Sequence, residues 1–288
     1  MKKVVRILGL CALMALAFSS CKKNETKGVS FSATIAQPES TSRTHGEFNA
    51  NHEYYLVWDD ADEIMIVNPD GSATCDFTVD SHSGSNAYFK TSDAAAMSFL
   101  ENLETATYTA FYPNAVYDDV NKTVTMQISN SQVITEQILD WGSFADEAYP
   151  MYGDNSVQWD NFVFDSDAGF LTLVIKGTPG SGQKSFDKVV LSTTDGMMIA
   201  GELVYDYDGT FNGFIGTNDT ITITSDHLVP VGPSLPAEIS FVLPECTLNG
   251  FYVDVYNGGT LLVHKRCNTV VPIVAKTYQV IMQELLIP

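Results

Sequence analysis

The sequence predicts an all-β protein whose mature part forms two tandem β-sandwich domains. Three observations support this. Apolar and polar residues alternate in many short segments, glycine-containing turns separate them, and only residues 93–103 have a helical pattern. Alternation with a period of two is typical of strands that bury one face. Many short strands with almost no helix indicate a sandwich rather than an α/β fold.

The amino terminus carries the features of a secretory signal peptide. Basic residues precede an apolar run over residues 7–18, and two serines then lead to Cys21. The run is shorter than the roughly 20 apolar residues needed to span a bilayer. A cysteine in this position resembles a bacterial lipobox, which implies cleavage before Cys21 and acylation of Cys21. Two or more acyl chains give stable membrane attachment. The alternative is an ordinary signal peptide with a chance cysteine.

Charge and composition limit the mature protein's partners. The signal peptide, residues 1–20, contains 3 of the 15 basic residues and none of the 35 acidic ones, which leaves 12 against 35, or −23. Such a surface repels nucleic acid and anionic headgroups. Apolar residues make up 45% of the chain, enough for packed cores. Residues 21–28 are polar and predict a lipidated tether.

The N-terminal domain is predicted over residues 29–160. Its first strand places Val29, Phe31, Ala33 and Ile35 on one face, and a polar loop is expected over residues 37–53. Residues 129–161 are expected to be irregular. Further strands are predicted over residues 54–58, 63–67, 75–79, 86–90, 108–112 and 123–128.

The C-terminal domain is predicted over residues 161–288. Its strands are expected over residues 162–164, 170–176, 188–192, 201–205, 220–223, 239–243, 251–256, 260–264 and 277–282. A hairpin across Gly258-Gly259 would bring Cys246 towards Cys267. The sequence leaves open whether these two form a disulfide or, with Cys75, are buried thiols.

Neither catalytic nor metal-binding motifs occur in the sequence. The five histidines have no metal-ligand spacing, and the Gly-x-Ser-x-Gly and Cys-x-x-Cys patterns are absent. We therefore expect no enzyme activity, no cofactor and no metal. The acidic stretches 59–63 and 206–208 favour a solvated surface, with Ca²⁺ binding as the alternative. Four aromatic residues between the domains either stack on sugar rings or pack the domains together: Trp141, Tyr149, Tyr152 and Trp159.

Several segments together resemble the fimbrillin-like family, the lipoprotein pilins and accessory subunits of Gram-negative anaerobes. The chain departs from the family pattern Trp-x-x-Gly-Asp at Ala61, where glycine is usual. The segments that carry the resemblance follow one another along nearly the whole mature chain: Phe31–Ile35, Ser42–Thr44, Trp58–Ile64, Tyr108–Pro113, Tyr149–Gly153, Phe164–Val174, Ala200-Gly201 and Lys276–Val280.

The resemblance implies transthyretin-like domains that assemble by strand exchange. In such subunits a protease cuts after an arginine, the first strand leaves, and a strand from a neighbouring subunit fills the groove. Here the removable strand would be Val29–Ala36 and the processing site Arg43; alternatively, Arg43 is a loop residue without a role. Few residues follow the last predicted strand, which favours a tip, accessory or anchor subunit over a stalk subunit that donates a strand.

The leading hypothesis is a lipid-anchored fimbrial subunit or adhesin at the outer membrane. Its expected partners are other fimbrial subunits through strand exchange, the membrane through its lipid, and a host glycan or protein receptor. The first alternative is a lipid-anchored carbohydrate-binding lipoprotein for nutrient uptake, and the second is a hydrolase. Fold class alone does not choose among them.

Overall fold

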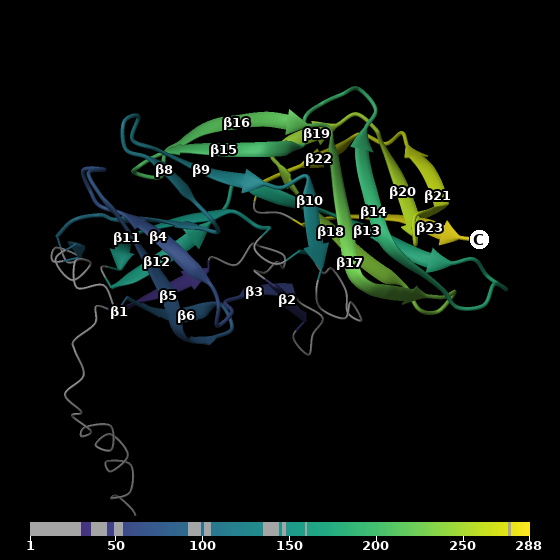
Figure 1. Ribbon diagram of the computed structural model, residues 1–288, viewed down its shortest axis with the longest axis horizontal. Coiled ribbons are helices and arrows are strands. Elements are labelled where there is room, and N and C mark those ends of the chain that lie inside the picture. Colours follow the sequence, from purple (N-terminus) through teal and green to yellow (C-terminus); the bar gives the residue numbers. More distant parts are fainter. Residues whose placement is uncertain are drawn as a thin grey trace, which may run out of the picture.

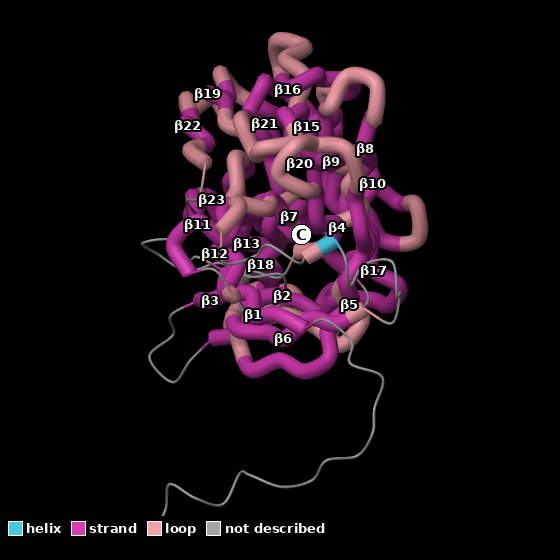
Figure 2. The backbone as a smooth tube through the Cα atoms, turned by 90° about the vertical axis from the view of Figure 1, so that its left-hand side faces the viewer, coloured by secondary structure: helices cyan, strands magenta, loops and turns pink. Residues whose placement is uncertain are grey.

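The all-β prediction is confirmed by the computed structural model, in which strands dominate (Figures 1 and 2). The structure describes residues 30–35, 45–48, 54–91, 99–100, 105–134, 144–145, 148–158, 160–275 and 278–288. The short helix expected over residues 93–103 lies mostly outside this part of the chain. Of its residues, Phe99 is helical and Leu100 lies in a turn.

Seven strands form a closed barrel at one end of the molecule (Figure 1). Each strand is hydrogen-bonded to two neighbours, and β6 pairs back onto β1, so the ring has no free edge. Around the ring the strands are β1 (Ser30–Ile35), β12 (Asn161–Asp165), β11 (Met151–Gln158), β7 (Thr109–Tyr112), β4 (Glu63–Val67), β5 (Thr74–Ser83) and β6 (Asn86–Lys90).

Two sheets build the other end of the molecule. The five-stranded sheet has the order β10 (Ser131–Ile134), β17 (Thr220–Val231), β14 (Lys184–Thr193), β20 (Phe251–Asn257) and β21 (Thr260–Cys267). The three-stranded sheet has the order β18 (Ala237–Pro244), β13 (Ala168–Gly177) and β23 (Tyr278–Ile287).

A four-stranded sheet lies along the top of Figure 1 between the two ends. Its order is β16 (Phe211–Asn218), β15 (Ala200–Asp206), β9 (Thr123–Ile128) and β8 (Val116–Asp118). Two small ladders complete the fold: β19 (Cys246–Leu248) with β22 (Val271–Ile273), and β2 (His45–Phe48) with β3 (Tyr54–Val57).

Main-chain pairing crosses residue 160 in both directions. β12 belongs to the barrel, whereas β9 and β10 pair with β15 and β17. The ladders therefore do not divide at residue 160, and the domain boundary proposed there stays a prediction.

Two segments expected to be irregular contain strands. The loop expected over residues 37–53 includes β2, and the stretch over residues 129–161 includes β10 and β11. β11 was missed because its sequence, MYGDNSVQ, is mostly polar and contains a glycine. That glycine is required: a Cβ on Gly153 would lie 2.4 Å from the carbonyl oxygen of Val163 on β12.

Aromatic side chains fill the barrel. Trp58 is fully buried, and its ring meets Phe89, Tyr112 and Phe164 edge-on at centroid distances of 5.1, 5.4 and 5.2 Å. Such edge-to-face pairs add to the stabilisation from burial alone. Tyr205 on β15 continues this core outwards, with its ring 5.9 Å from Phe111 on β7.

Candidate strand-exchange site

β1 is the strand that closes the barrel, because it pairs with a different neighbour on each side. It runs antiparallel to β6, with Phe31 opposite Phe89, and parallel to β12, with Ala33 opposite Phe162. Without β1, the ring would open between β6 and β12. The opening would be one strand wide and lined on both sides by main-chain hydrogen-bonding groups.

The inward face of β1 is strongly anchored in the core. Phe31, Ala33 and Ile35 are all buried. The Phe31 ring lies 5.0 Å from Phe77 and 4.9 Å from Phe162, measured between ring centroids. Because burying one large apolar side chain contributes about 1.5–3 kcal/mol, an unfilled groove would be costly. A replacement strand must therefore supply apolar side chains at alternate positions.

The outward face of β1 is polar and fixes the register of the strand. The Ser32 hydroxyl donates to the carbonyl oxygen of Asp160. Thr34 Oγ1 lies 2.9 Å from Asn86 Oδ1 and 3.2 Å from Asn161 Oδ1, so it contacts both neighbouring strands. These groups border an open hollow of about 420 Å³ on the outside of the barrel. An incoming strand with small polar residues at these positions would keep the same contacts.

The Trp58–Ile64 segment, which carries part of the family resemblance, fixes the entry to β4. Asp62 is buried, and its carboxylate accepts hydrogen bonds from the Asp59 backbone N–H at 2.6 Å and from the Tyr112 hydroxyl at 2.7 Å. Among the described residues, positive φ angles at non-glycine positions occur at Asn114 and Lys122. The turn therefore accommodates Ala61 where the family has glycine.

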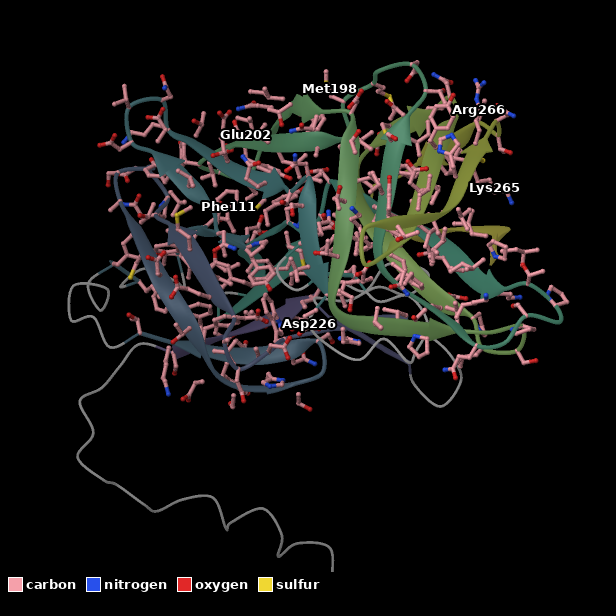
Figure 3. The ribbon with its side chains drawn as sticks, turned by 45° about the vertical axis from the view of Figure 1, so that its right-hand side comes forward. Phe111, Met198, Glu202, Asp226, Lys265 and Arg266 are labelled. Atoms are coloured by element: carbon pink, nitrogen blue, oxygen red, sulfur yellow. The ribbon has the colours of Figure 1, made fainter. Side chains whose placement is uncertain are left out.

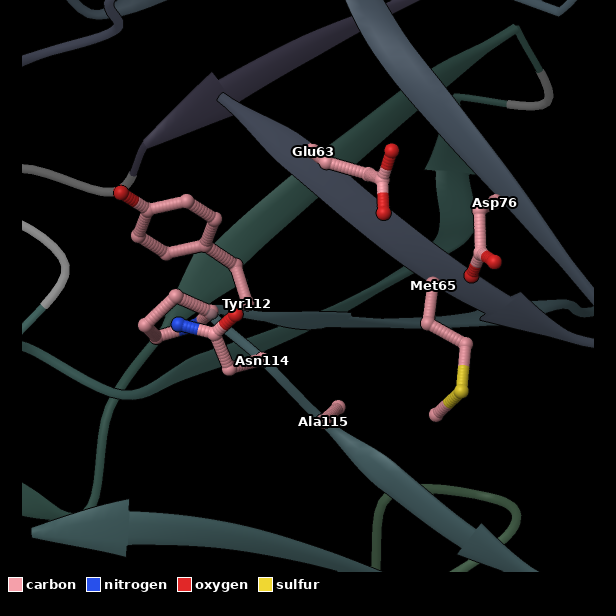
Figure 4. Close-up of a pocket in the computed structure, with 7 residues that line it drawn as sticks. Glu63, Met65, Asp76, Tyr112, Asn114 and Ala115 are labelled. Carbon is pink, nitrogen blue, oxygen red and sulfur yellow. The ribbon is translucent and has the colours of Figure 1, made fainter. Parts of the chain in front are cut away.

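A second hollow, of about 320 Å³, lies beside this turn (Figure 4). Figure 4 shows the carboxylates of Glu63 and Asp76 on the same side, from neighbouring strands β4 and β5, with Met65 and Asn114 near them. The described residues contain no group of three or more His, Cys, Asp or Glu placed to hold a metal ion.

Several residues singled out from the sequence lie outside the described residues. They are Cys21, Val29, Arg43, Trp141 and Trp159. Their assigned roles in lipidation, strand removal, processing and ligand stacking stay predictions.

The two remaining stacking candidates pack inside the protein. Tyr149 is buried, with its ring 4.6 Å from that of Phe170 on β13. Tyr152 is half-buried, and its ring lies 5.0 Å from that of Tyr205 on β15. The Tyr149 ring is therefore not accessible to a ligand, and Tyr152 joins the barrel to the four-stranded sheet.

The three cysteines beyond Cys21 are thiols in the structure. Cys267 pairs with Phe251 across the hairpin, whereas Cys246 lies on β19 opposite Ile273, so the disulfide considered between them does not form. Burial, with a smaller contribution from Glu245, raises the pKa of the Cys246 thiol to about 11.

Sequence reasoning predicted β1 and a strand over residues 162–164, which lies within β12, but it did not predict that the two strands pair. Asn161, which contacts Thr34 from β12, sits at a position where the sequence suggested only a domain boundary. Parallel pairing between segments this far apart leaves no local signal, since no short turn connects the strands.

Comparison with known proteins supports the fold. No protein-family model matches the sequence, and no curated protein is similar to it in sequence. Among solved structures, the chain is similar to a "putative cell adhesion protein" from Bacteroides ovatus. The TM-score is 0.53 at 12% identity, over 86% of this chain and 88% of that one. This likeness shows a shared fold and is consistent with the fimbrillin-like resemblance.

Two further structures are similar over most of their length. One is a "putative cell adhesion protein" from Bacteroides uniformis, with a TM-score of 0.43 at 15% identity, over 89% of this chain and 93% of that one. The other is a fimbrial assembly protein from Parabacteroides distasonis, with a TM-score of 0.35 at 9% identity, over 88% and 90% of the two chains. Among the described residues, no helix is long and apolar enough to cross a membrane.

Proposed function

We propose that this protein is a lipid-anchored adhesin or fimbrial subunit of the outer membrane, without catalytic activity, that assembles by strand exchange at β1. The observation that carries this proposal is that β1 alone joins β6 to β12 and thereby closes the barrel. The shared fold with a protein described as a cell adhesion protein supports the surface role.

The proposed exchange follows from elementary strand pairing. Loss of β1 leaves unpaired N–H and C=O groups on β6 and β12 and exposes the aromatic groove that holds Phe31. Main-chain hydrogen bonds would give a donor strand its affinity, and pockets for alternate side chains would give it specificity. A donor with apolar residues spaced like Phe31, Ala33 and Ile35 fits this groove.

The proposed role is that of an acceptor, as in a tip, accessory or anchor subunit. β23 is engaged within its own protein, because it pairs in parallel with β13 from Tyr278 to Ile287. A strand so engaged would have to leave β13 before it could enter a neighbouring groove. We therefore assign the exchange to β1 rather than to β23.

Limited trypsin digestion of the mature protein tests this proposal. We expect a cut after Arg43 that leaves a stable core, and once the severed segment that contains β1 has been separated from it, this core should bind a synthetic peptide of residues 29–36. A matched peptide with serine in place of Phe31, Ala33 and Ile35 should not bind, and an Arg43→Gln variant should resist the cut. A core that binds both peptides equally, or binds neither after the cut, would refute strand exchange at β1.

A further inference from the structure

Positive charge gathers on one sheet of this acidic protein. The five strands of this sheet carry four Lys and Arg residues and three carboxylates, a net charge of +1, within a chain whose net charge is −20. Four of the seven Lys and Arg residues in the described part of the chain lie on β14 and β21; the seven are Lys90, Lys122, Lys176, Lys184, Lys188, Lys265 and Arg266.

The strand register places Arg266 and Lys188 on the outer face of this sheet. On the inner face, Val189 and Leu191 of β14 and Val253 and Val255 of β20 are buried in the core. Because side chains alternate along a strand, the residues before and after each of these buried ones point to solvent.

Two cations on the outer face each lie opposite a tyrosine: Arg266 lies opposite Tyr252, and Lys188 lies opposite Tyr256. Figure 3 shows Arg266 beside β20 and β21, away from the barrel.

Aromatic rings hold these cations in place. The Arg266 guanidinium lies 5.7 Å from the centre of the Tyr252 ring, and the Lys188 ammonium lies 4.1 Å from the centre of the Tyr256 ring. His264 stacks on Tyr252 at 5.2 Å. Such contacts orient a cation while leaving its N–H donors free for a ligand.

The carboxylates near the two cations do not neutralise them. Within the described residues, no carboxylate lies at ion-pair distance from Arg266 or Lys188. The carboxylate on the outer face, Asp254, is about one-fifth exposed and accepts a hydrogen bond from His264 Nδ1. Arg266 and Lys188 are therefore free of ion pairs with the described residues and can each meet an anionic group, while Asp254 lies between them on the same face.

Hydroxyl groups continue the same face across β14 and β17. Ser192 lies between Tyr252 and Thr220, and Thr222 and Thr224 follow along β17. All four residues are half-buried. Val190, half-buried between Asp254 and Thr222, is the apolar residue among them. The hydroxyls match the hydroxyls of a sugar chain, and the two cations match carboxylates carried on it.

We propose that the outer face of β14, β17, β20 and β21 binds an oligosaccharide that carries uronic acid carboxylates. This inference rests on the proposed adhesion function and names its ligand class. The planar guanidinium of Arg266 fits one carboxylate through two parallel hydrogen bonds. Lys188 takes a second carboxylate. Lys188 and Arg266 are two strands apart across the sheet and four residues apart along it, which places their Cα atoms about 16 Å apart. A ligand that reaches both cations therefore spans several sugar units.

Calorimetric titration of the full mature protein tests this assignment. The probes are a short oligogalacturonate and its methyl ester, which has the same sugar chain without the charge. We expect the acid form to bind and the ester to bind at least about tenfold more weakly, and we expect high salt to weaken the acid form. Arg266→Gln and Lys188→Gln should each cost about tenfold in affinity.

Lys90→Gln is the matched control, because it removes the same charge from the barrel, where Lys90 pairs with Asp80 on β5. It should leave oligogalacturonate affinity unchanged. Equal binding of acid and ester, no binding of the acid form, or equal binding of polyglutamate would overturn the glycan assignment. If oligogalacturonate does not bind but the trypsin-cut core still binds the residue 29–36 peptide, the glycan inference alone is refuted. If oligogalacturonate binds as expected but the trypsin-cut core does not bind the peptide, only the strand-exchange proposal is refuted.

Discussion

The ring of Phe31 lies 4.9 Å from the ring of Phe162, so the first strand of the barrel packs against the strand that follows residue 160. The two residues come from parallel strands that are far apart in the sequence. The barrel can therefore close only after both segments have been synthesised.

Replacing Phe31 with alanine should destabilise the barrel by about 3–5 kcal/mol, because it removes a buried ring that contacts three other phenylalanines. Urea unfolding would measure the loss. The same variant should exchange β1 more readily for an added peptide of residues 29–36. Ser30→Ala, at an exposed position of the same strand, should change neither property. A Phe31→Ala variant as stable as the parent would contradict the packing described for β1.

Asp62→Ala should cost about 2–4 kcal/mol, because the Asp62 carboxylate accepts hydrogen bonds from both the Asp59 backbone and the Tyr112 hydroxyl. Thermal unfolding would reveal the change. Asp60→Ala provides the control, since the Asp60 side chain is 96% exposed and its pair with His82 is a surface contact. Equal effects of the two substitutions would show that Asp62 does not organise this turn.

Gly153→Ala should destabilise the barrel by about 1–3 kcal/mol or more, because the added Cβ would lie 2.4 Å from the Val163 carbonyl oxygen and force β11 away from β12. Gly182→Ala is a sharp comparison, since nothing lies within 4 Å of its added Cβ. That change should be neutral or stabilising by up to about 1 kcal/mol. Chemical denaturation of both variants measures the difference in unfolding free energy. A Gly153→Ala variant as stable as the parent would disprove the close approach of β11 to the Val163 carbonyl.

The contribution of Glu238 on β18 should make stability fall as pH rises from 4.5 to about 7. Burial raises the pKa of Glu238 to about 7, with Lys176 opposing the shift. Between the ordinary value of 4.5 and 7, the folded protein keeps a proton that the unfolded chain releases. The free energy of unfolding then decreases by up to about 1.4 kcal/mol per pH unit.

Glu238→Gln should remove this decrease, measured by urea unfolding at several pH values against the parent protein. Glu202→Gln is the control, because Glu202 sits on β15 at the surface, where its Oε1 accepts from Gln127. A variant at position 238 that retains the full decrease would show that another group is responsible.

The sequence was sufficient to predict the all-β class and most strands. The strands over residues 63–67, 86–90 and 123–128 have the predicted bounds: the last two alternate in burial, and the first is a short run of four buried apolar residues after Glu63. β8, β16, β19 and β22 were missed because they are short, exposed or rich in glycine and polar residues. Alternation detects a half-buried strand and fails when neither face is clearly apolar.

The candidate sites were only partly predictable. The alternation of Phe31, Ala33 and Ile35 identified one buried face, but the two neighbours of β1 depend on long-range pairing. The three consecutive basic side chains of His264–Arg266 stand out in the sequence of a chain with few basic residues. Its relation to Lys188 and Tyr252 could not be predicted, because the strand order that brings β14 beside β20 is set by tertiary packing.

The pairing of β9 with β15 and of β10 with β17 has a consequence for synthesis. When residues 123–134 leave the ribosome, the segments that will cover their free edges, residues 200–231, have not yet been made. Such non-local contacts form slowly and leave strand edges open in the meantime. A fragment that stops near residue 160 would keep those edges permanently uncovered and should aggregate when expressed alone.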